Sequence, residues 1–571
     1  MGAGGSAAVW YPRPWAGFGD TYRVARDFRC ARGQTRGVTP QPDSTPPGRA
    51  AVVTVVAAAL VAAAARLPAT AAPLGPDESG YTMVGRAWAP QPDSPFGPYW
   101  VDRPPLLIAV FRSSDALGGL SGIRWLAVLA AALAVVAAAV AALEVVAHVR
   151  PAATRHEASV IVGLTAVAAA ALVSNPSIDV LLAKGEILSV NLLLGSMGLA
   201  LRAVRTRSTT VAVVAGTLAT AAPGLKQNLV GGVVFAVTLV GLEWWRRRID
   251  TASALRLGGA LALGMSLPVL GTVIWALVAG VHLSALWDSI VGVRSDAIGV
   301  LIEGSLGTGR NLQRIKTLAV VSVTSGIALV LAGLVAHVVR RRRAASSVAW
   351  AALVVACVDG AGLVLGGYFR LPYLYAIVPS TVVALALLLT LGTDRPRRYE
   401  QLAAGLLVVV VVASAIASAV PWLQDLPRFQ RPSTPVMLGR SIGAVSEPGD
   451  SLTMLFGSAN TQIQSGLPSP YLHLWSLLAR TRDPHREEIR RVLEGSDAPT
   501  WVVATYDVGG MVGEGDDARL GAVLRARYEE VGTACGGREV YRRIDRPRPD
   551  PVLRCAALRR EYGADWVAPV S

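Results

Sequence analysis

The chain alternates between long apolar runs and shorter polar segments. Many of the apolar runs reach ~18 residues or more, and at about 1.5 Å per residue such a run crosses a hydrocarbon core of about 30 Å. The pattern predicts about eleven transmembrane helices. We expect them at residues 50–72, 122–147, 158–175, 179–201, 208–223, 227–245, 256–280, 316–339, 346–367, 372–392 and 402–421.

The linkers between these runs alternate in charge. One set is rich in arginine: residues 150–155, 202–207, 246–248, 340–343 and 395–398, together with Arg49 and the N-terminal arginines. The other set is acidic, nearly uncharged or mixed: residues 73–121, 175–179, 223–226, 281–315 and 367–371. Since basic linkers are retained on the cytoplasmic side, an odd number of spans places the N-terminus inside and the C-terminus outside.

Composition supports a membrane protein, with 52% hydrophobic residues, 16% charged residues and a mean hydropathy of +0.45. The formal net charge of +15 would also suit a nucleic-acid-binding protein. The basic residues, however, lie in short linkers beside apolar runs, which is typical of topology signals and not of a phosphate-binding face. We therefore expect a lipid bilayer as the surroundings and no nucleic-acid partner.

The two ends of the chain differ from its middle. Residues 1–48 are rich in Arg, Gly and Pro and lack an apolar stretch of the signal-peptide kind, so we expect a disordered cytoplasmic tail. Residues 49–421 form the predicted transmembrane domain. Residues 422–571 are mixed and polar, and strand-like and helix-like patterns alternate there, which indicates a small extracytoplasmic α/β domain. Its role is either acceptor recognition or purely structural.

Within that last region, residues 450–459, 500–507 and 538–544 have strand patterns, whereas residues 485–495 and 518–531 have apolar positions at helical spacing. Cys535 and Cys555 also lie there. If the region is extracytoplasmic they can form a disulfide, and the alternative is two free thiols. The four cysteines of the chain form no metal-binding motif.

One polar stretch, residues 73–112, lies between two apolar runs and carries four acids: Asp77, Glu78, Asp93 and Asp102. Charges and irregular backbone beside a bilayer are costly, so the stretch either faces water or lines a site. Further polar residues lie at the outer ends of later spans: Glu186, Lys226, Arg370 and Tyr373. Taken singly, each has a structural explanation as a helix cap or as an anchor at the lipid headgroups.

Taken together, these motifs resemble those of the GT-C class of membrane glycosyltransferases, and in particular glycosyltransferase family 39, which includes protein O-mannosyltransferases and the aminoarabinose transferase of lipid A. The resemblance rests on Asp77-Glu78 in GPDESGY, on Asp102-Arg103-Pro-Pro-Leu in YWVDRPPLL, on Lys226 in PGLKQN and on Arg370-x-x-Tyr373 in GGYFRLPYLYAIVPS. It covers about residues 50–400. Many relatives have Glu-Lys in place of Asp102-Arg103 and Lys-Gly-Pro in place of Lys-Gln-Asn, so the sugar does not carry over.

The resemblance implies an all-α polytopic membrane protein of GT-C architecture, with the outer loop 73–121 as its catalytic loop. It also implies an inverting transfer of a sugar from a polyprenyl-phosphate donor to a hydroxyl of a glycan, lipid or protein acceptor, at the outer face of a bacterial plasma membrane.

The chemistry of that reaction assigns roles to the residues. An acceptor hydroxyl must lose its proton as it attacks, so a carboxylate is needed as general base, and Asp77 is the candidate. Glu78, Asp102 and Glu186 would orient the acceptor or hold a divalent cation, for which Asp77 is a further candidate ligand. The alternative is that these carboxylates only bind neighbouring arginines. Arg103, Lys226 and Arg370 would stabilise the phosphate leaving group, with Tyr373 beside them.

Two other classes of function remain open. A transporter or flippase of a lipid-linked or polar solute would need charged groups along a path to the inner face, and the basic inner linkers show no acidic lining. A scaffold or sensor that presents the C-terminal domain would retain the fold without catalysis.

Overall fold

A computed structural model describes residues 47–562, apart from 307–309, 368, 392–397 and 506. All described residues fall within one compact unit, Pro42–Ser571. The expected N-terminal tail, residues 1–48, lies outside the described residues except for its last two. Most of the basic linker 395–398 also lies outside them.

The described residues contain seven helical segments that are long and apolar enough to cross a membrane, or eight if a bent pair is counted as one. The long helices are α1 (Arg49–Arg66), α4 (Gly122–Val149), α5 (Arg155–Val173), α6 (Gly185–Thr206), α9 (Thr251–Val278), α14 (Ser347–Leu365) and α16 (Arg398–Gln430). Three shorter apolar helices lie at three further expected spans: α7 (Thr209–Leu225), α8 (Gly231–Trp245) and α15 (Val378–Leu391). The expectation of a polytopic helical membrane protein is confirmed.

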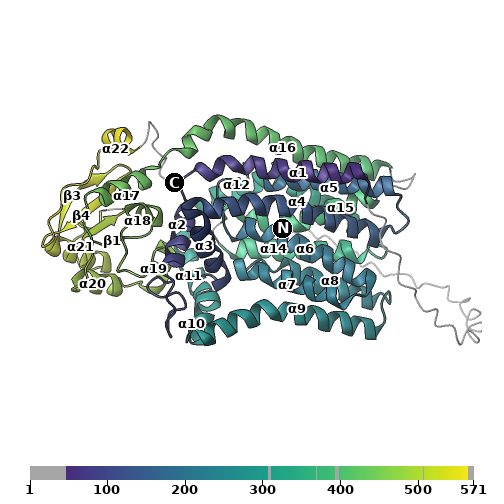
Figure 1. Ribbon diagram of the computed structural model, residues 1–571, viewed down its shortest axis with the longest axis horizontal. Coiled ribbons are helices and arrows are strands. Elements are labelled where there is room, and N and C mark those ends of the chain that lie inside the picture. The colour runs from purple at the N-terminus through teal and green to yellow at the C-terminus, as the bar shows by residue number, and fades with distance from the viewer. Residues whose placement is uncertain (1–46, 307–309, 368, 392–397, 506, 563–571) are drawn as a thin grey trace, which may run out of the picture. The chain divides into compact units, whose positions relative to one another are not determined.

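Small residues let these helices approach closely. A Cβ atom on Gly198 of α6 would lie 3.0 Å from the Cα of Ala141 in α4, and one on Gly264 of α9 would lie 2.0 Å from the carbonyl oxygen of Val213 in α7. Such contacts are how helices associate in lipid, where the hydrophobic effect does not hold them together. Figure 1 shows α7, α8 and α9 running side by side in consequence.

The expected span 316–339 is interrupted. Helix α12 (Arg310–Thr324) and helix α13 (Ile327–Arg340) meet at a bend of 69°. Gly326 at the junction has φ +82°, a conformation that ends an α-helix and that glycine adopts without steric cost. A Cβ atom there would also lie 2.7 Å from Val411 of α16. Both the backbone conformation and the lack of space therefore favour glycine at position 326.

The expected span 179–201 begins later than predicted, at Gly185. Residues 174–184 form an irregular loop instead, because side chains satisfy its backbone. Arg66 donates to the carbonyl oxygens of Val173 and Asp179 and to the hydroxyl of Tyr375, while Asp179 accepts from the backbone N–H groups of Leu181 and Leu182. Buried backbone groups need such partners. The loop lines the cavity described below.

The polar stretch after the first span is also structured. It contains α2 (Pro76–Arg86) and α3 (Pro105–Gly118). Each begins with proline at its first position, where a backbone N–H would make no hydrogen bond within the helix. The side chain of Glu78 accepts from the backbone N–H of Gly75 at 2.8 Å and so caps α2.

The C-terminal region contains a four-stranded sheet in the order β1-β2-β4-β3. Strand β1 (Leu452–Met454) pairs parallel with β2 (Trp501–Ala504), and β4 (Arg538–Arg543) pairs antiparallel with β2 and β3 (Tyr528–Ala534). The helices around it are α17 (Thr434–Ala444), α18 (Ala459–Ser465), α19 (Ser476–Arg482), α20 (Glu487–Glu494), α21 (Asp516–Arg527) and α22 (Cys555–Tyr562). Helix α16 continues past residue 421, and the division of the chain into domains stays a prediction.

Two details of this region bear on the expectations. The helix predicted over residues 518–531 is wrong at its end, because α21 stops at Arg527 and the next residues form β3, whose backbone pairs with β4 and whose first residue, Tyr528, is buried. Cys535 and Cys555 are joined by a disulfide between the end of β3 and the start of α22.

Candidate active site

A cavity of about 810 Å³ brings together segments from most of the chain. The polar stretch contributes α2 and the residues before α3, the transmembrane region contributes the loop before α6 and the turn after α7, and the C-terminal region contributes residues 456–458 and 474–478. Its charged lining comprises six basic and four acidic side chains: Arg103, Lys184, Lys226, Arg294, Arg314, Arg370, Asp77, Asp102, Asp179 and Glu186. The excess of basic groups suits an anionic ligand.

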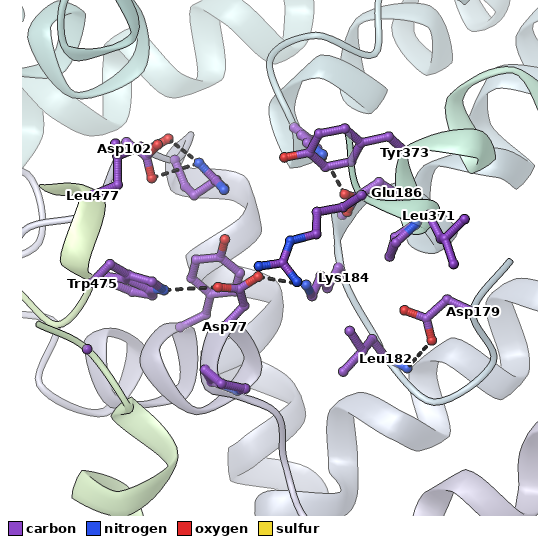
Figure 2. Close-up of a pocket in the computed structure, with 18 of the residues that line it drawn as sticks. Asp77, Asp102, Asp179, Leu182, Lys184, Glu186, Leu371, Tyr373, Trp475 and Leu477 are labelled. Atoms are coloured by element: carbon purple, nitrogen blue, oxygen red, sulfur yellow. Dashed lines mark hydrogen bonds and ion pairs between the residues drawn. The ribbon is translucent and has the colours of Figure 1, made fainter. Parts of the chain in front are cut away.

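Asp77 lies on the cavity wall at the first turn of α2. One carboxylate oxygen, Oδ2, is 2.6 Å from the ammonium nitrogen of Lys184, and the other, Oδ1, accepts from the indole N–H of Trp475 at 3.1 Å. Figure 2 shows the carboxylate between these two groups. The Asp77 side chain is still 35% exposed, because it faces the cavity and not the protein interior.

The electrostatics keep Asp77 ionised. Burial would raise the pKa of this carboxyl, but the neighbouring Lys184 and Arg103 and the hydrogen bond from Trp475 outweigh burial and lower its pKa below the usual value. Lys184 shows the complementary effect: burial would lower its pKa, but Asp77 and Glu186 raise it. The pair is therefore charged at neutral pH.

Glu78, although next to Asp77 in sequence, lies behind the cavity wall. Its side chain is fully buried; it pairs with Arg124 at 2.7 Å and accepts from the backbone N–H groups of Ala183 and Gly75. Successive helical residues point about 100° apart, which explains why the two acids face different partners. Glu78 thus ties α2 to α4 and to the loop before α6, a role in holding the site together.

Asp102 and Arg103 lie on the wall just before α3. Asp102 is paired with Arg103 at 2.7 Å, and its other oxygen with Arg294 of α11 (Val293–Leu306) at 2.5 Å. The guanidinium of Arg103 also lies over the ring of Tyr81, 5.6 Å from the ring centroid. Asp102 therefore orients two arginines that border the cavity.

Glu186 and Lys226 form a buried ion pair between the start of α6 and the turn after α7. The ammonium of Lys226 lies 3.8 Å from the centroid of the Tyr373 ring, a cation–π contact. Burial lowers the pKa of Lys226 to about 8, and Glu186 opposes this effect. Burial also raises the pKa of the Tyr373 hydroxyl, so that this group stays protonated.

Arg370 lines the same cavity but is exposed, and its side chain makes no ion pair or hydrogen bond within the described part of the chain. It precedes the short helix Leu371–Ala376 that carries Tyr373. An arginine with no acidic neighbour is available to bind an anionic group of a ligand.

The cavity thus brings together Asp77, Asp102, Arg103, Glu186, Lys226, Arg370 and Tyr373, and leaves Glu78 outside its lining. It also adds residues that sequence analysis did not assign to the site, notably Trp475 and Arg294. Trp475 had no local signal, since it lies in a region without a recognised motif. Arg294 belongs to the linker 281–315, whose mixed charges do not distinguish it from its neighbours, and the structure places it in α11.

The acids proposed as metal ligands are not arranged as a metal site. Asp77, Glu78 and Asp102 are paired with Lys184, Arg124 and Arg103, respectively. Among the described residues, no cluster of three or more His, Cys, Asp or Glu side chains could hold a metal ion. The residues present do not fit a divalent cation, and no step below depends on one.

Comparison with known proteins identifies the fold. No protein-family model and no curated protein sequence matches this chain. Among solved structures, the apo form of the oligosaccharyltransferase of Archaeoglobus fulgidus is similar, with a TM-score of 0.51 and 13% identity over 80% of this chain and 70% of that one. ArnT of Cupriavidus metallidurans bound to undecaprenyl phosphate aligns with a TM-score of 0.47 and 16% identity, over 86% and 97% of the two chains. The first of these likenesses, at 13% identity, shows the fold alone: the chain has the GT-C fold.

Proposed function

We propose that this protein is a glycosyltransferase of the bacterial plasma membrane. It moves a sugar from a polyprenyl-phosphate donor to a hydroxyl group of a glycan, lipid or protein acceptor on the extracytoplasmic face, and inverts the anomeric centre. The proposal is supported chiefly by one observation: a single cavity joins an ionised, cavity-facing Asp77 to basic groups from three separate elements, Arg103, Lys226 and Arg370.

Asp77 would be the general base. A carboxylate within hydrogen-bond reach of the acceptor hydroxyl takes its proton as the oxygen attacks the anomeric carbon. Its lowered pKa makes it a weak base, but it guarantees the ionised form, and the partial proton transfer of a glycosyl transition state does not require a strong base.

The leaving group would be stabilised by fixed cations. As the glycosidic bond breaks, the polyprenyl phosphate gains negative charge, and positively charged groups placed in advance lower the energy of that state. Arg370 has no acidic partner to displace, whereas Lys226 and Arg103 are held in place by Glu186 and Asp102. Glu186 and Asp102 would thus act mainly by positioning these cations.

The location follows from charge. The arginine-rich linkers are retained in the cytoplasm under the positive-inside rule, so the outer loop 73–121, the cavity and the C-terminal region would face outward. There a lipid-linked donor keeps its tail in the bilayer and its phosphate at the surface. Residues 456–458 and 474–478 would then border the path of the acceptor.

The test is a deletion strain analysed by mass spectrometry of its cell-wall glycans, lipids and secreted proteins. Loss of one sugar from one of these pools, restored by the wild-type chain and not by Asp77→Asn, is the expected result. Asp93→Asn is the matched control, since Asp93 lies in the same stretch, is 94% exposed at its side chain and is not part of the cavity lining. No change in any pool would overturn the proposal.

A transporter would give a different result in reconstituted vesicles. It would move a labelled lipid-linked sugar across the bilayer without an acceptor. A loss of function in Asp77→Asn alone would not distinguish that movement from sugar transfer. The proposed enzyme requires an acceptor for any loss of donor.

A further inference from the structure

Trp475, in the C-terminal region, contacts the candidate base Asp77. It immediately precedes α19 and donates its indole N–H to Oδ1 of Asp77, 398 positions earlier in the sequence. Since Lys184 pairs with the other oxygen, the two contacts fix both oxygens of the carboxylate and hence the direction of the remaining lone pairs. A free aspartate side chain would rotate about its terminal bond.

The indole ring itself is held tightly against α2. It packs on Tyr81 with the ring centroids 5.3 Å apart, and it approaches Gly80 so closely that a Cβ atom on Gly80 would lie 2.3 Å from the ring. Gly80 is buried on the turn that follows Asp77. The helix that carries the candidate base thus has a glycine at the position where Trp475 needs space.

The segment around Trp475 is anchored on both sides. Tyr99 accepts from the backbone N–H of Ser469, and the backbone N–H of Trp100 donates to Leu472. Arg482, at the end of α19, pairs with Asp288 and lies over the ring of Trp100. These contacts fix the segment 469–482 to the polar stretch and to the helical turn Asp288–Gly292 before α11, so Trp475 is supported by several neighbours and does not depend on the Asp77 contact for its place.

We propose that Trp475 is a positioning residue of the transfer reaction, whose indole N–H holds the Asp77 carboxylate in the orientation that accepts a proton from the acceptor hydroxyl. This rests on the proposed function and on Asp77 as the base. It gives the C-terminal region a role in catalysis beyond forming a wall of the cavity. The donor side of the site, with Lys226 and Arg370, is not touched by Trp475.

The kinetic test uses Trp475→Phe, which keeps an aromatic ring packed against α2 and removes the indole N–H. We expect kcat to fall about tenfold, the usual scale for a hydrogen bond to a charged group, while KM for the polyprenyl-phosphate sugar stays unchanged. Trp245→Phe is the control, since Trp245 is 79% exposed at the end of α8. An unchanged kcat, or an equal rise in donor KM, would overturn the proposal.

A second variant displaces the ring without altering it. Gly80→Ala should push the indole away and reduce kcat by a similar factor, and the double variant with Trp475→Phe should lose little more than either single variant, since both act on one contact. Gly241→Ala is the control, because a Cβ atom there meets nothing within 4 Å. Multiplying effects in the double variant would show that Gly80 and Trp475 act separately and would contradict the proposal.

A third measurement does not need activity. In protein labelled with 5-fluorotryptophan, the fluorine resonance of Trp475 can be assigned by its loss in Trp475→Phe. It should shift in Asp77→Ala and not in Asp93→Ala. If the shift is present but the wild-type chain transfers no sugar, the proposed function is wrong and the contact between Trp475 and Asp77 is correct. If the chain transfers sugar but the shift is absent, the positioning role is wrong and the proposed function is retained.

Discussion

The ammonium group of Lys226 lies 3.8 Å from the centre of the Tyr373 ring and is paired with Glu186 in the buried part of the site. The carboxylate and the ring favour the charged form of the lysine, but burial outweighs Glu186 and lowers the pKa of Lys226 to about 8. This relationship makes the proposed phosphate site sensitive to pH.

We expect kcat/KM for the polyprenyl-phosphate sugar to fall as the pH rises through about 8. A lysine is charged below its pKa and neutral above it, so the phosphate contact is present at lower pH and lost at higher pH. Lys226→Arg should keep its charge and remove this alkaline loss, measured as the pH profile of kcat/KM. An unaltered profile in Lys226→Arg would show that another group titrates.

Replacing Arg370 by Ala should weaken donor binding about tenfold to a hundredfold, the scale of a charge-assisted hydrogen bond to phosphate. Because the Arg370 side chain has no partner within the described residues, the variant leaves no acid unpaired and should fold normally. Donor KM and the thermal stability of the detergent-solubilised protein check this. Arg440→Ala, another exposed arginine, should change neither; loss of stability in Arg370→Ala would indicate a structural role instead.

Replacing Glu78 by Gln should mainly destabilise the protein. It leaves the buried Arg124 without its charged partner, which costs about 3–5 kcal/mol. Thermal unfolding should therefore shift strongly, while the folded fraction keeps a kcat within about threefold of the wild type. A large loss of kcat in protein that remains fully folded would return Glu78 to a direct catalytic role.

Sugar transfer should persist in the presence of a chelator. Asp77, Glu78 and Asp102 each have a cationic partner, so a divalent cation would have to displace Lys184, Arg124 or Arg103 to bind them. Initial rates measured with EDTA and after addition of Mg²⁺ or Mn²⁺ should agree within about twofold. A rate restored only by one of these ions would mean that the ion pairs rearrange around it.

The sequence predicts those parts of the site that contrast with their surroundings. Asp77, Asp102 and Arg103 stand out because they are charged residues between apolar runs, where charge is costly. Lys226 and Arg370 are found through motifs that resemble a family. Hydropathy locates the seven span-length helices of the described residues, and the short apolar helices α7, α8 and α15 also lie at expected spans.

The rest depends on contacts that no local pattern encodes. Asp77 and Glu78 are adjacent and look like a pair, but the turn of α2 separates their partners. Trp475 resembles any aromatic residue of a folded region until its position against Gly80 is known. Residues 528–531 continue the helical spacing of α21, yet pairing with β4 makes them a strand. In each case tertiary packing decides between alternatives that the sequence leaves equal.

The 398 positions between Asp77 and Trp475 have a consequence for biosynthesis. The helix with the candidate base leaves the ribosome early, while its indole partner follows only after the last membrane span and must itself be exported under the proposed topology. A nascent or truncated chain that ends within the bundle would insert into the bilayer and yet have an unfinished site. The proposed enzyme would thus become competent only once the segment that carries Trp475 has crossed the membrane, on the side where its proposed substrates meet.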